Sequence, residues 1–486
     1  MKIYNSLTRQ KEDFQPFHQG HVKMYVCGPT VYGFLHVGNF RGPVFFNLVR
    51  KYLEKKGYQV EYALNFTDVD DKIINRALAE NCTPSEISEK FIAEYKKDFS
   101  NLELVPHEHN PKVTEHLGSI ESMISLLIEK KKAYAVDGDV YFQVDQFEKY
   151  GKLSGRNTDD VMTGTRVEAE NNKKASADFA LWKKTKPKEV SWPSPWGDGR
   201  PGWHIECSAM IESLFDGQVD IHGGAIDLLF PHHENELAQS EAAGDRAFVK
   251  YWMHVNLLNF GGQKMSKSLG NIVSLREFSE KYPLELYKWL ILSSHYRSVI
   301  DFADESLDRA TSSLARIYSS LSLAESFLSQ EVLVTEQDFQ KAKTDLMIES
   351  NIKKIQESLD DDFNTPEVWA VVFETVRILN SKLKRGAKVT GYSKALALSF
   401  SSWLKDLGSL MSLFQKPATQ FLIDMDDLLL KKKSLLRSDI ESIIQQRTEA
   451  RLSKDFAKSD ELRKKLDDLG ISVMDFPGGS FWEVGK

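Results

Sequence analysis

Residues able to ligate a metal ion occur at several points in the chain. His232 and Glu236 stand four residues apart in the segment PHHENELAQS, so on a helix they would share one face and both could reach one ion. Such pairs are also common on solvated helix faces, where they bind nothing. The zinc-protease motif His-Glu-x-x-His is absent, because His233 is followed four positions later by Leu237. This excludes a metalloprotease of that kind.

Cys27 and Cys207 could add two soft ligands to this pair. Two thiolates, an imidazole and a carboxylate would form a four-ligand zinc site. Cys27 ends a predicted strand and would lie where open α/β sheets place their ligands. The two cysteines are 180 residues apart, and the alternative is a pair of buried, unreactive thiols. The third cysteine, Cys82, precedes a predicted helix start and is interpreted as a structural or surface thiol.

Two short motifs offer groups that could bind phosphate. KMSKS places Lys264 and Lys267 three residues apart after two glycines, which suits a mobile cationic clamp on phosphate oxygens. An ordinary lysine-bearing surface loop is the alternative. His36 and Asn39 follow the first strand and open a helix, whose N-terminal amides can also hold phosphate. The motifs GxxxxGK[ST] and GxGxxG are absent, which disfavours P-loop hydrolases and dehydrogenases.

The elements that position these residues begin as a βαβ unit. Residues 22–27 alternate apolar and polar side chains like a half-buried strand. A helix is predicted from about 38 to 56, stopping at Gly57, and a second strand follows at 60–66. A helix with a capping box is predicted from Thr83. This order indicates a parallel sheet.

An insertion interrupts that sheet over about 110–200. Asp137-Gly138 between two apolar runs predicts a β-hairpin there. Strand-like runs resume at 218–224 and 251–258. From about 284 to 415, apolar residues recur at helical spacing, which indicates a helical bundle.

The C-terminal part is locally basic. Residues 431–466 hold 11 Lys and Arg against 6 Asp and Glu, and GISVMDFPGGSFW predicts a strand and a turn. The whole chain has 63 Lys and Arg against 70 Asp and Glu, a net charge of −7. This argues against whole-molecule attraction to nucleic acid, although a local basic patch stays possible.

Composition places the chain among ordinary globular proteins. Its 486 residues are 41% hydrophobic and 27% charged, which excludes collagen-like, disordered and disulfide-scaffold classes. The N-terminus lacks the pattern of a signal peptide, and no run of 18 apolar residues occurs. We therefore expect no membrane association. Three cysteines fit a reducing compartment, and we expect the protein to be cytoplasmic.

Several motifs taken together resemble cysteinyl-tRNA synthetase, a family of class I aminoacyl-tRNA synthetases. The resemblance runs in order from about residue 1 to 310 and returns at 447–482, whereas the helical region between matches only in kind. Its motifs are HVGN, MYVCGPTVY, NFTDVDDKII, GRPGWHIECSAM, DIHGGAIDLLFPHHENELAQS and KMSKSLGN.

The resemblance implies a fold and a domain order. The expected fold class is α/β, with a Rossmann-like parallel-sheet catalytic domain, a connective insertion, an α-helical bundle and a small C-terminal α+β domain. The expected domains are the catalytic domain at 1–110 and 201–260, the insertion at 111–200, the KMSKS loop and stem-contact region at 261–310, the bundle at 311–420 and the anticodon-binding domain at 421–486.

The resemblance also implies that one zinc ion is held by Cys27, Cys207, His232 and Glu236. Cysteine and serine differ only by sulfur against oxygen, and an apolar pocket separates such near-isosteres poorly. Zinc binds a thiolate strongly and a hydroxyl weakly, so it would act as a selectivity element, binding the substrate sulfur as a fifth ligand. Hydrolytic editing would then not be needed.

The implied reaction has two steps. ATP and L-cysteine form cysteinyl-adenylate and pyrophosphate, and cysteine then passes to the 3′ end of tRNA(Cys). His36 and Lys267 would stabilise phosphate charge with help from Lys264 and from Mg²⁺. Asn39 stands where the family commonly has histidine, and an amide cannot carry a positive charge. We therefore expect His36 to contribute more to phosphate stabilisation than Asn39. The remaining expected contacts are Asn39, Gly223, Gly224 and Asp227 for ATP, and Thr67, Trp203 and His222 for the amino acid.

The basic C-terminal helix resembles the family's anticodon helix. Arg451, Phe456 and Asp460 stand where relatives contact anticodon bases, and a solvated amphipathic helix is the alternative. Many relatives have tryptophan where this chain has Phe456. We expect a monomer. Two other functions are considered. A ligase of cysteine to an amino-sugar acceptor is disfavoured by residues 447–482, because such relatives lack an anticodon-binding domain. A non-catalytic, zinc-dependent RNA-binding protein is disfavoured by the intact His36 and KMSKS.

Overall fold

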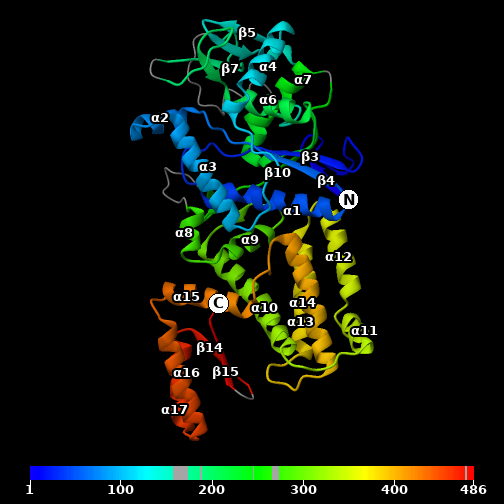
Figure 1. Ribbon diagram of the computed structural model, residues 1–486, viewed down its shortest axis with the longest axis vertical. Helices are drawn as coiled ribbons and strands as arrows, with labels where there is room; N and C mark the ends of the chain where they lie inside the picture. The colour runs from blue at the N-terminus through cyan, green and yellow to red at the C-terminus, as the bar shows by residue number, and fades with distance from the viewer. Residues whose placement is uncertain (157–172, 187–188, 245, 265–272, 477–478, 486) are drawn as a thin grey trace. The chain divides into compact units, whose positions relative to one another are not determined.

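The chain forms two compact units in the computed structural model (Figure 1). The first unit comprises Met1–Leu257 and Tyr296–Val299, and the second comprises Leu258–His295 and Ile300–Lys486. The structure describes residues 1–156, 173–186, 189–244, 246–264, 273–476 and 479–485. Of the two KMSKS lysines, only Lys264 lies within the described residues. The five predicted domain boundaries stay a prediction.

A four-stranded parallel sheet is the centre of the first unit. Its strand order is β10–β9–β3–β4, and every neighbouring pair is parallel. β3 and β4 are the two strands expected at 22–27 and 60–66, and α1 joins them. The expected α/β fold class is confirmed. The bounds are β3 (His21–Val26), α1 (Arg41–Lys55), β4 (Gln59–Leu64), β9 (Val219–Ala225) and β10 (Val249–Val255).

Local sequence signals account for several neighbouring elements. α3 (Pro84–Asn101) begins with the predicted capping box, in which Thr83 and Glu86 satisfy each other's backbone N–H groups. The predicted hairpin is also present, because Asp137 and Gly138 adopt φ values of 52° and 96°. Positive φ at both positions is what a two-residue hairpin turn requires. Other elements before the insertion are β1 (Lys2–Asn5), β2 (Gln10–Asp13) and α2 (Asp71–Glu80), and the insertion begins with α4 (Leu117–Glu129).

The insertion forms its own antiparallel sheet. Its order is β5–β6–β7–β8, and buried side chains of this sheet share one core cluster with α6. This packing places the insertion against the helix that carries Cys207. The bounds are β5 (Ala133–Val136), β6 (Asp139–Phe142), β7 (Phe179–Lys184), β8 (Gly199–Pro201), α6 (Trp203–Phe215) and α7 (Glu234–Ala243).

The second unit is mainly helical and contains the predicted bundle. A small sheet of order β12–β11–β13 precedes it. Apolar residues that recur at helical spacing along α10, among them Leu307, Leu314 and Ile317, are buried. The bounds are β11 (Leu258–Phe260), β12 (Gln263–Lys264), α8 (Leu275–Ser279), α9 (Leu284–Leu292), β13 (Ile300–Asp301), α10 (Asp304–Leu328), α11 (Glu336–Asp345), α12 (Ile348–Asp360), α13 (Thr365–Lys382) and α14 (Gly391–Met411).

The C-terminal segment has three helices and a hairpin. β14 and β15 pair antiparallel and share a small core with α16 and α17. Arg447 crosses from α16 to β14, where both terminal guanidinium nitrogens donate to Asp475 at 2.8 and 2.7 Å. No helix among the described residues is long and apolar enough to cross a membrane. The bounds are α15 (Ala418–Lys432), α16 (Arg437–Leu452), α17 (Phe456–Asp468), β14 (Ile471–Phe476) and β15 (Gly479–Val484).

Candidate metal centre

The carboxyl end of the parallel sheet carries the first of the predicted metal ligands. Cys27 directly follows β3, and its backbone N–H donates to the carbonyl of Gly223 on β9 at 3.0 Å. The next residue, Gly28, has no room for a side chain, because a Cβ there would lie 1.7 Å from the carbonyl oxygen of Asn65. The close approach of the two strand ends therefore fixes the position of Cys27.

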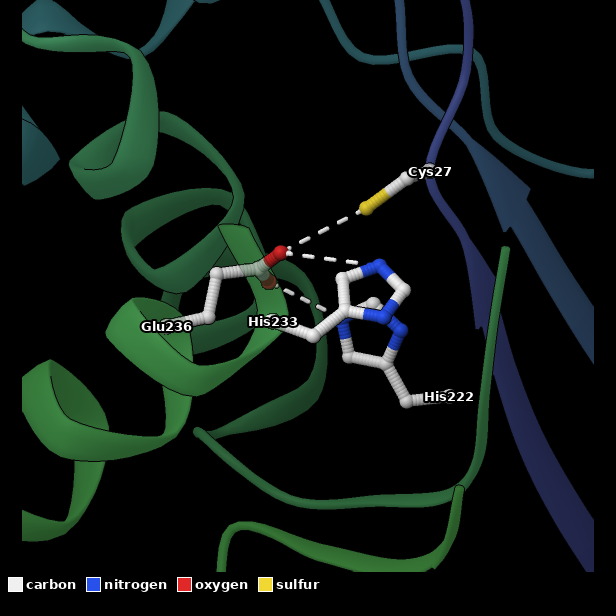
Figure 2. Close-up of side chains that lie close together, drawn as sticks. All are labelled: Cys27, His222, His233 and Glu236. Atoms are coloured by element: carbon white, nitrogen blue, oxygen red, sulfur yellow. Dashed lines mark hydrogen bonds and ion pairs between the residues drawn. The ribbon is translucent and has the colours of Figure 1, made fainter. Parts of the chain in front are cut away.

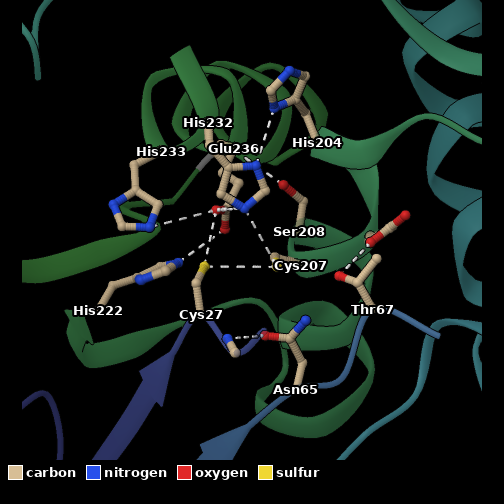
Figure 3. Close-up of polar contacts among 12 residues, drawn as sticks. Cys27, Asn65, Thr67, His204, Cys207, Ser208, His222, His232, His233 and Glu236 are labelled. Carbon is tan, nitrogen blue, oxygen red and sulfur yellow. Dashed lines mark hydrogen bonds and ion pairs between the residues drawn. The ribbon is translucent and has the colours of Figure 1, made fainter. Parts of the chain in front are cut away.

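Two helices and an irregular turn between them supply the other three ligands. Cys207 lies on α6, His232 lies in the irregular turn η5 (Leu229–His233), and Glu236 lies in the first turn of α7. These three side chains are at most 2% exposed, whereas Cys27 is half-buried. Figure 3 shows the four side chains converging from these separate elements.

The four donor atoms form a tight group. The sulfur atoms of Cys27 and Cys207 are 3.7 Å apart, and Glu236 Oε1 lies 3.5 Å from Cys27 Sγ and 3.0 Å from His232 Nε2. All four donors lie within 4.8 Å of one another. Two sulfurs, one imidazole nitrogen and one carboxylate oxygen suit a divalent, borderline-soft cation such as zinc.

A second donor group shares two of these residues. It combines Cys27 and Glu236 with His222 and His233 (Figure 2). His222 Nε2 lies 2.9 Å from Glu236 Oε2, whereas Cys27 and His232 contact the other carboxylate oxygen, Oε1. This group has one sulfur instead of two, and His222 already occupies one oxygen of the carboxylate. The first group is therefore the better zinc site, and His222 orients its carboxylate ligand.

Charges inside the cluster already favour a cation. Burial would raise the pKa of Glu236, but His222 and His232 outweigh it and hold that pKa well below its ordinary value. A hydrogen bond from Cys27 lowers the pKa of Cys207 to about 6. Burial would lower the pKa of His232, but Glu236 and Cys207 raise it to about 10. These shifts favour a thiolate at Cys207 and a carboxylate at Glu236, whereas burial raises the pKa of the Cys27 thiol well above its ordinary value. A metal ion bound there would displace the protons of Cys27 and His232.

Further histidines surround the cluster, and sequence reasoning missed them. His204 Nδ1 lies 3.1 Å from His232 Nδ1. On the other side, His233 Nδ1 lies 2.8 Å from His254 Nε2, and His254 Nδ1 lies 2.8 Å from the hydroxyl of Ser6. His204 directly follows Trp203, and His233 directly follows His232. Because Trp203 and His232 were predicted site residues, this adjacency was the signal that could have identified the two histidines.

The three residues predicted for the amino-acid pocket lie around this centre. Trp203 is 40% exposed, and its ring stacks on His232 with centroids 4.3 Å apart. His222 is fully buried and stacks on Trp252. Thr67 follows β4, and its hydroxyl donates to Glu206 at 3.1 Å. Glu206 is a further buried acidic residue that sequence reasoning missed.

The residues predicted for ATP fall into two groups. His36 and Asn39 open the short helix η1 (Val37–Phe40), where the Asn39 side chain accepts from the His36 N–H at 3.0 Å. Gly223 and Gly224 end β9, and a Cβ there would lie 2.3 Å from Phe46 and 2.7 Å from His233, respectively. Packing alone therefore requires glycine at both positions. Asp227 follows at the exposed turn η4 (Ile226–Leu228), Lys264 lies in β12, and Lys267 lies outside the described residues.

The predicted anticodon contacts lie at the junction of α16 and α17. Arg451 pairs with Asp475, the residue that Arg447 also holds. Phe456 is the first residue of α17 and is 65% exposed, and Asp460 is exposed one turn later. An exposed aromatic ring within a basic segment is suited to stacking on an unpaired base.

Comparisons with known proteins agree with this architecture. Residues 13–312 match the family described as tRNA synthetases class I (C) catalytic domain. Residues 354–415 match the DALR domain, and residues 434–482 match the cysteinyl-tRNA ligase anticodon binding domain. The cysteine–tRNA ligase of Bdellovibrio bacteriovorus is 60% identical over 486 residues, covering 100% of both chains. The chain belongs to the cysteinyl-tRNA synthetase family.

Other relatives support the same assignment. The cysteine–tRNA ligase of Geobacter metallireducens is 43% identical and covers 100% of this chain and 99% of its own. Methionyl-tRNA synthetase from Mycobacterium tuberculosis, solved with methionyl-adenylate, has a TM-score of 0.62 at 11% identity, covering 83% of this chain and 93% of that one. This likeness shows the class I synthetase fold alone. The predicted family, fold and enzyme class, a cysteine–tRNA ligase, are confirmed.

Proposed function

We propose that this cysteinyl-tRNA synthetase selects its amino acid through one zinc ion held by Cys27, Cys207, His232 and Glu236. The observation that carries the proposal is the convergence of their four donor atoms within 4.8 Å. When bound there, zinc would bind the thiolate of cysteine far more strongly than the hydroxyl of serine. Selectivity would then come from the first binding step, without hydrolysis of a wrong product.

The surrounding side chains would orient the substrate. Trp203 stacks on His232 while part of its ring stays exposed, so it can cover an amino acid bound at the metal. Thr67 is held by Glu206, which points its hydroxyl in one direction. His222 holds Glu236 Oε2, which leaves Oε1 for the metal. These contacts fix the orientations of the predicted pocket residues, which supports their role in positioning the amino acid.

ATP would bind at the first helix and at the end of β9. His36 would stabilise phosphate charge, assisted by the N-terminal amides of its helix. Gly223 and Gly224 would let adenosine approach the backbone, and Asp227 would bind ribose hydroxyls. We also expect ATP to be contacted by Asn39, Lys264, Lys267 and Mg²⁺. The amino-acid carboxylate would attack the α-phosphate and displace pyrophosphate.

Transfer of cysteine to tRNA(Cys) would use the C-terminal segment for recognition. Phe456 would stack on an anticodon base, with Arg451 and Asp460 beside it. The ion pair of Arg451 with Asp475 supports a fixed position for the Arg451 side chain. A monomeric, cytoplasmic enzyme stays our prediction. No observation favours the amino-sugar ligase or the RNA-binding alternative.

The test is amino-acid-dependent exchange of pyrophosphate into ATP by zinc-loaded protein. Exchange with cysteine and none with serine is the expected result. The same assay on protein stripped with a chelator and reloaded with zinc separates a metal effect from damage, since reloading should restore exchange. Exchange that is equal for both amino acids, or unchanged after complete zinc removal, would overturn the proposed role of the metal.

A further inference from the structure

The ring of His204 borders the metal centre without belonging to either group of candidate ligands. We propose that His204 is a positioning residue, whose Nδ1 accepts a hydrogen bond from the Nδ1–H of His232 and so keeps Nε2 of His232 directed at the metal. This inference rests on the proposed zinc site. It concerns a residue that neither contacts the amino acid in our proposal nor ligates the ion.

The geometry distinguishes the two nitrogens of His232. Its Nε2 faces the other ligands, at 3.0 Å from Glu236 Oε1 and 3.7 Å from Cys207 Sγ. Its Nδ1 faces away from them and lies 3.1 Å from His204 Nδ1. A neutral imidazole carries one proton, so an Nε2 that ligates a metal leaves the proton on Nδ1. That buried N–H needs an acceptor, and His204 Nδ1 is the atom within reach.

His204 must be neutral to accept this hydrogen bond. The neutral ring then carries its only proton on Nε2, because its Nδ1 lone pair is directed at His232. The same hydrogen bond serves the cationic, metal-free form of His232, since Nδ1 carries a proton in both forms.

The surroundings hold His204 in place for this role. Gln239 of α7 donates to the His204 carbonyl at 2.8 Å and to the Ser208 hydroxyl at 2.9 Å. The ring of Phe179 meets the His204 ring edge-on, with centroids 5.5 Å apart. The two contacts of Gln239 tie the helix of Cys207 to the helix of Glu236 at His204 and one turn later, at Ser208. A hydrogen bond accepted from a ligating histidine also increases the electron density at its metal-binding nitrogen.

The experiment compares two replacements of His204 in the full chain. In His204→Asn, the amide oxygen can take the place of Nδ1 as acceptor, whereas His204→Leu removes the acceptor at similar volume. We expect zinc affinity, measured by competition with a chromophoric chelator, to fall about 10- to 100-fold for His204→Leu. For His204→Asn we expect a change of less than about fivefold, since the acceptor is retained. His109→Leu is the matched control, because His109 pairs with Glu61 and contacts no metal ligand.

Cobalt(II) supplies a readout that loss of packing alone would not move. We expect the visible ligand-field bands of the Co²⁺-loaded protein to shift in His204→Leu and to stay in place in His204→Asn. Equal zinc affinities and equal spectra for the two variants would overturn the inference. Should His204→Leu fail to fold, nitrogen-15 NMR of the zinc-loaded wild type still decides, because a His204 ring protonated on Nδ1 contradicts the proposal.

The outcomes separate this inference from the proposed function. Wild-type protein that binds no zinc, or a Cys207→Ser variant that binds it as tightly, would contradict the metal site itself. Tight zinc binding by the wild type together with unchanged binding by His204→Leu would contradict only the role of His204.

Discussion

The sulfur atoms of Cys27 and Cys207 lie 3.7 Å apart, although 180 residues separate them in the chain. One ends the first strand of the parallel sheet, and the other lies on a helix beyond the insertion. Both cysteines are free, and no disulfide joins them. Their proximity is what a shared metal ion requires.

Replacing one of these sulfurs tests the metal site most directly. In Cys207→Ser we expect zinc content to fall from about one ion per chain to less than about 0.2, because a serine hydroxyl is a poor zinc ligand. Metal analysis of dialysed protein measures it. Cys82→Ser is the matched control, since Cys82 belongs to neither group of donors, and it should keep its zinc. Full zinc retention by Cys207→Ser would contradict the proposed ligand set.

The second KMSKS lysine should act on ATP and not on tRNA. We expect Lys267→Ala to reduce the rate of cysteine-dependent pyrophosphate exchange by about 100-fold or more, because a positioned cation on the phosphates is lost. Affinity for tRNA should change less than about twofold, since one phosphate contact at most is removed. Filter binding measures that affinity. Lys343→Ala, at an exposed position of α11, is the control, and an unaltered exchange rate in Lys267→Ala would refute the assignment.

Acid should destabilise the first unit through His107. Burial and the charge of Arg50 lower the pKa of His107 to about 3, against an ordinary value of 6.5. The unfolded chain therefore binds a proton between these values that the folded chain does not bind. The stabilisation is complete above pH 6.5 and is lost as the pH falls towards 3.

Urea unfolding of wild type and His107→Phe measures this effect. Phenylalanine keeps the ring between Tyr62 and Phe99, which both contact His107. Between pH 6 and 5 we expect the free energy of unfolding of the wild type to fall by about 1 kcal/mol more than that of the variant. Between pH 7.5 and 8.5 the two should run parallel. If the free energies of unfolding of the two proteins also change in parallel at acidic pH, His107 is not the source of the acid destabilisation.

The exposed ring of Phe456 should contribute to tRNA recognition. We expect Phe456→Ala to weaken tRNA binding about tenfold, because stacking on a base contributes ~1–3 kcal/mol, and Phe456→Trp to strengthen it. The KM for tRNA in aminoacylation measures the effect, while pyrophosphate exchange should not change. Leu333→Ala is the control, because it removes an apolar side chain that is even more exposed, at 85%, from another part of the same unit. The same KM in both alanine variants would argue against a stacking role.

Features that depend only on residues close together in the chain could be predicted from the sequence. The capping box of Thr83 and Glu86 and the turn at Asp137-Gly138 depend on contacts within four residues. The spacing of His232 and Glu236 likewise put both on one side of a helical turn. Hydrophobic periodicity was sufficient for the parallel sheet and the bundle, since each element buries one face or stripe.

Features that join distant segments could not be predicted in the same way. His204 meets His232 only because η5 folds back across α6, and no local pattern encodes that crossing. The same holds for Arg447 and Asp475, whose ion pair depends on how the hairpin packs on α16. From the residues alone, Cys27 and Cys207 could be metal ligands or a pair of buried, unreactive thiols, and only the family resemblance favours the metal set.

The placement of the insertion has a consequence for the order in which the enzyme matures during synthesis. Cys27 leaves the ribosome 209 residues before Glu236, and the insertion is made between them. The first strand, its helix and the second strand can already pair while the donor set still lacks three of its four members. A nascent chain can therefore pair β3 with β4 early, but its four candidate metal ligands are complete only after the first turn of α7 has been made.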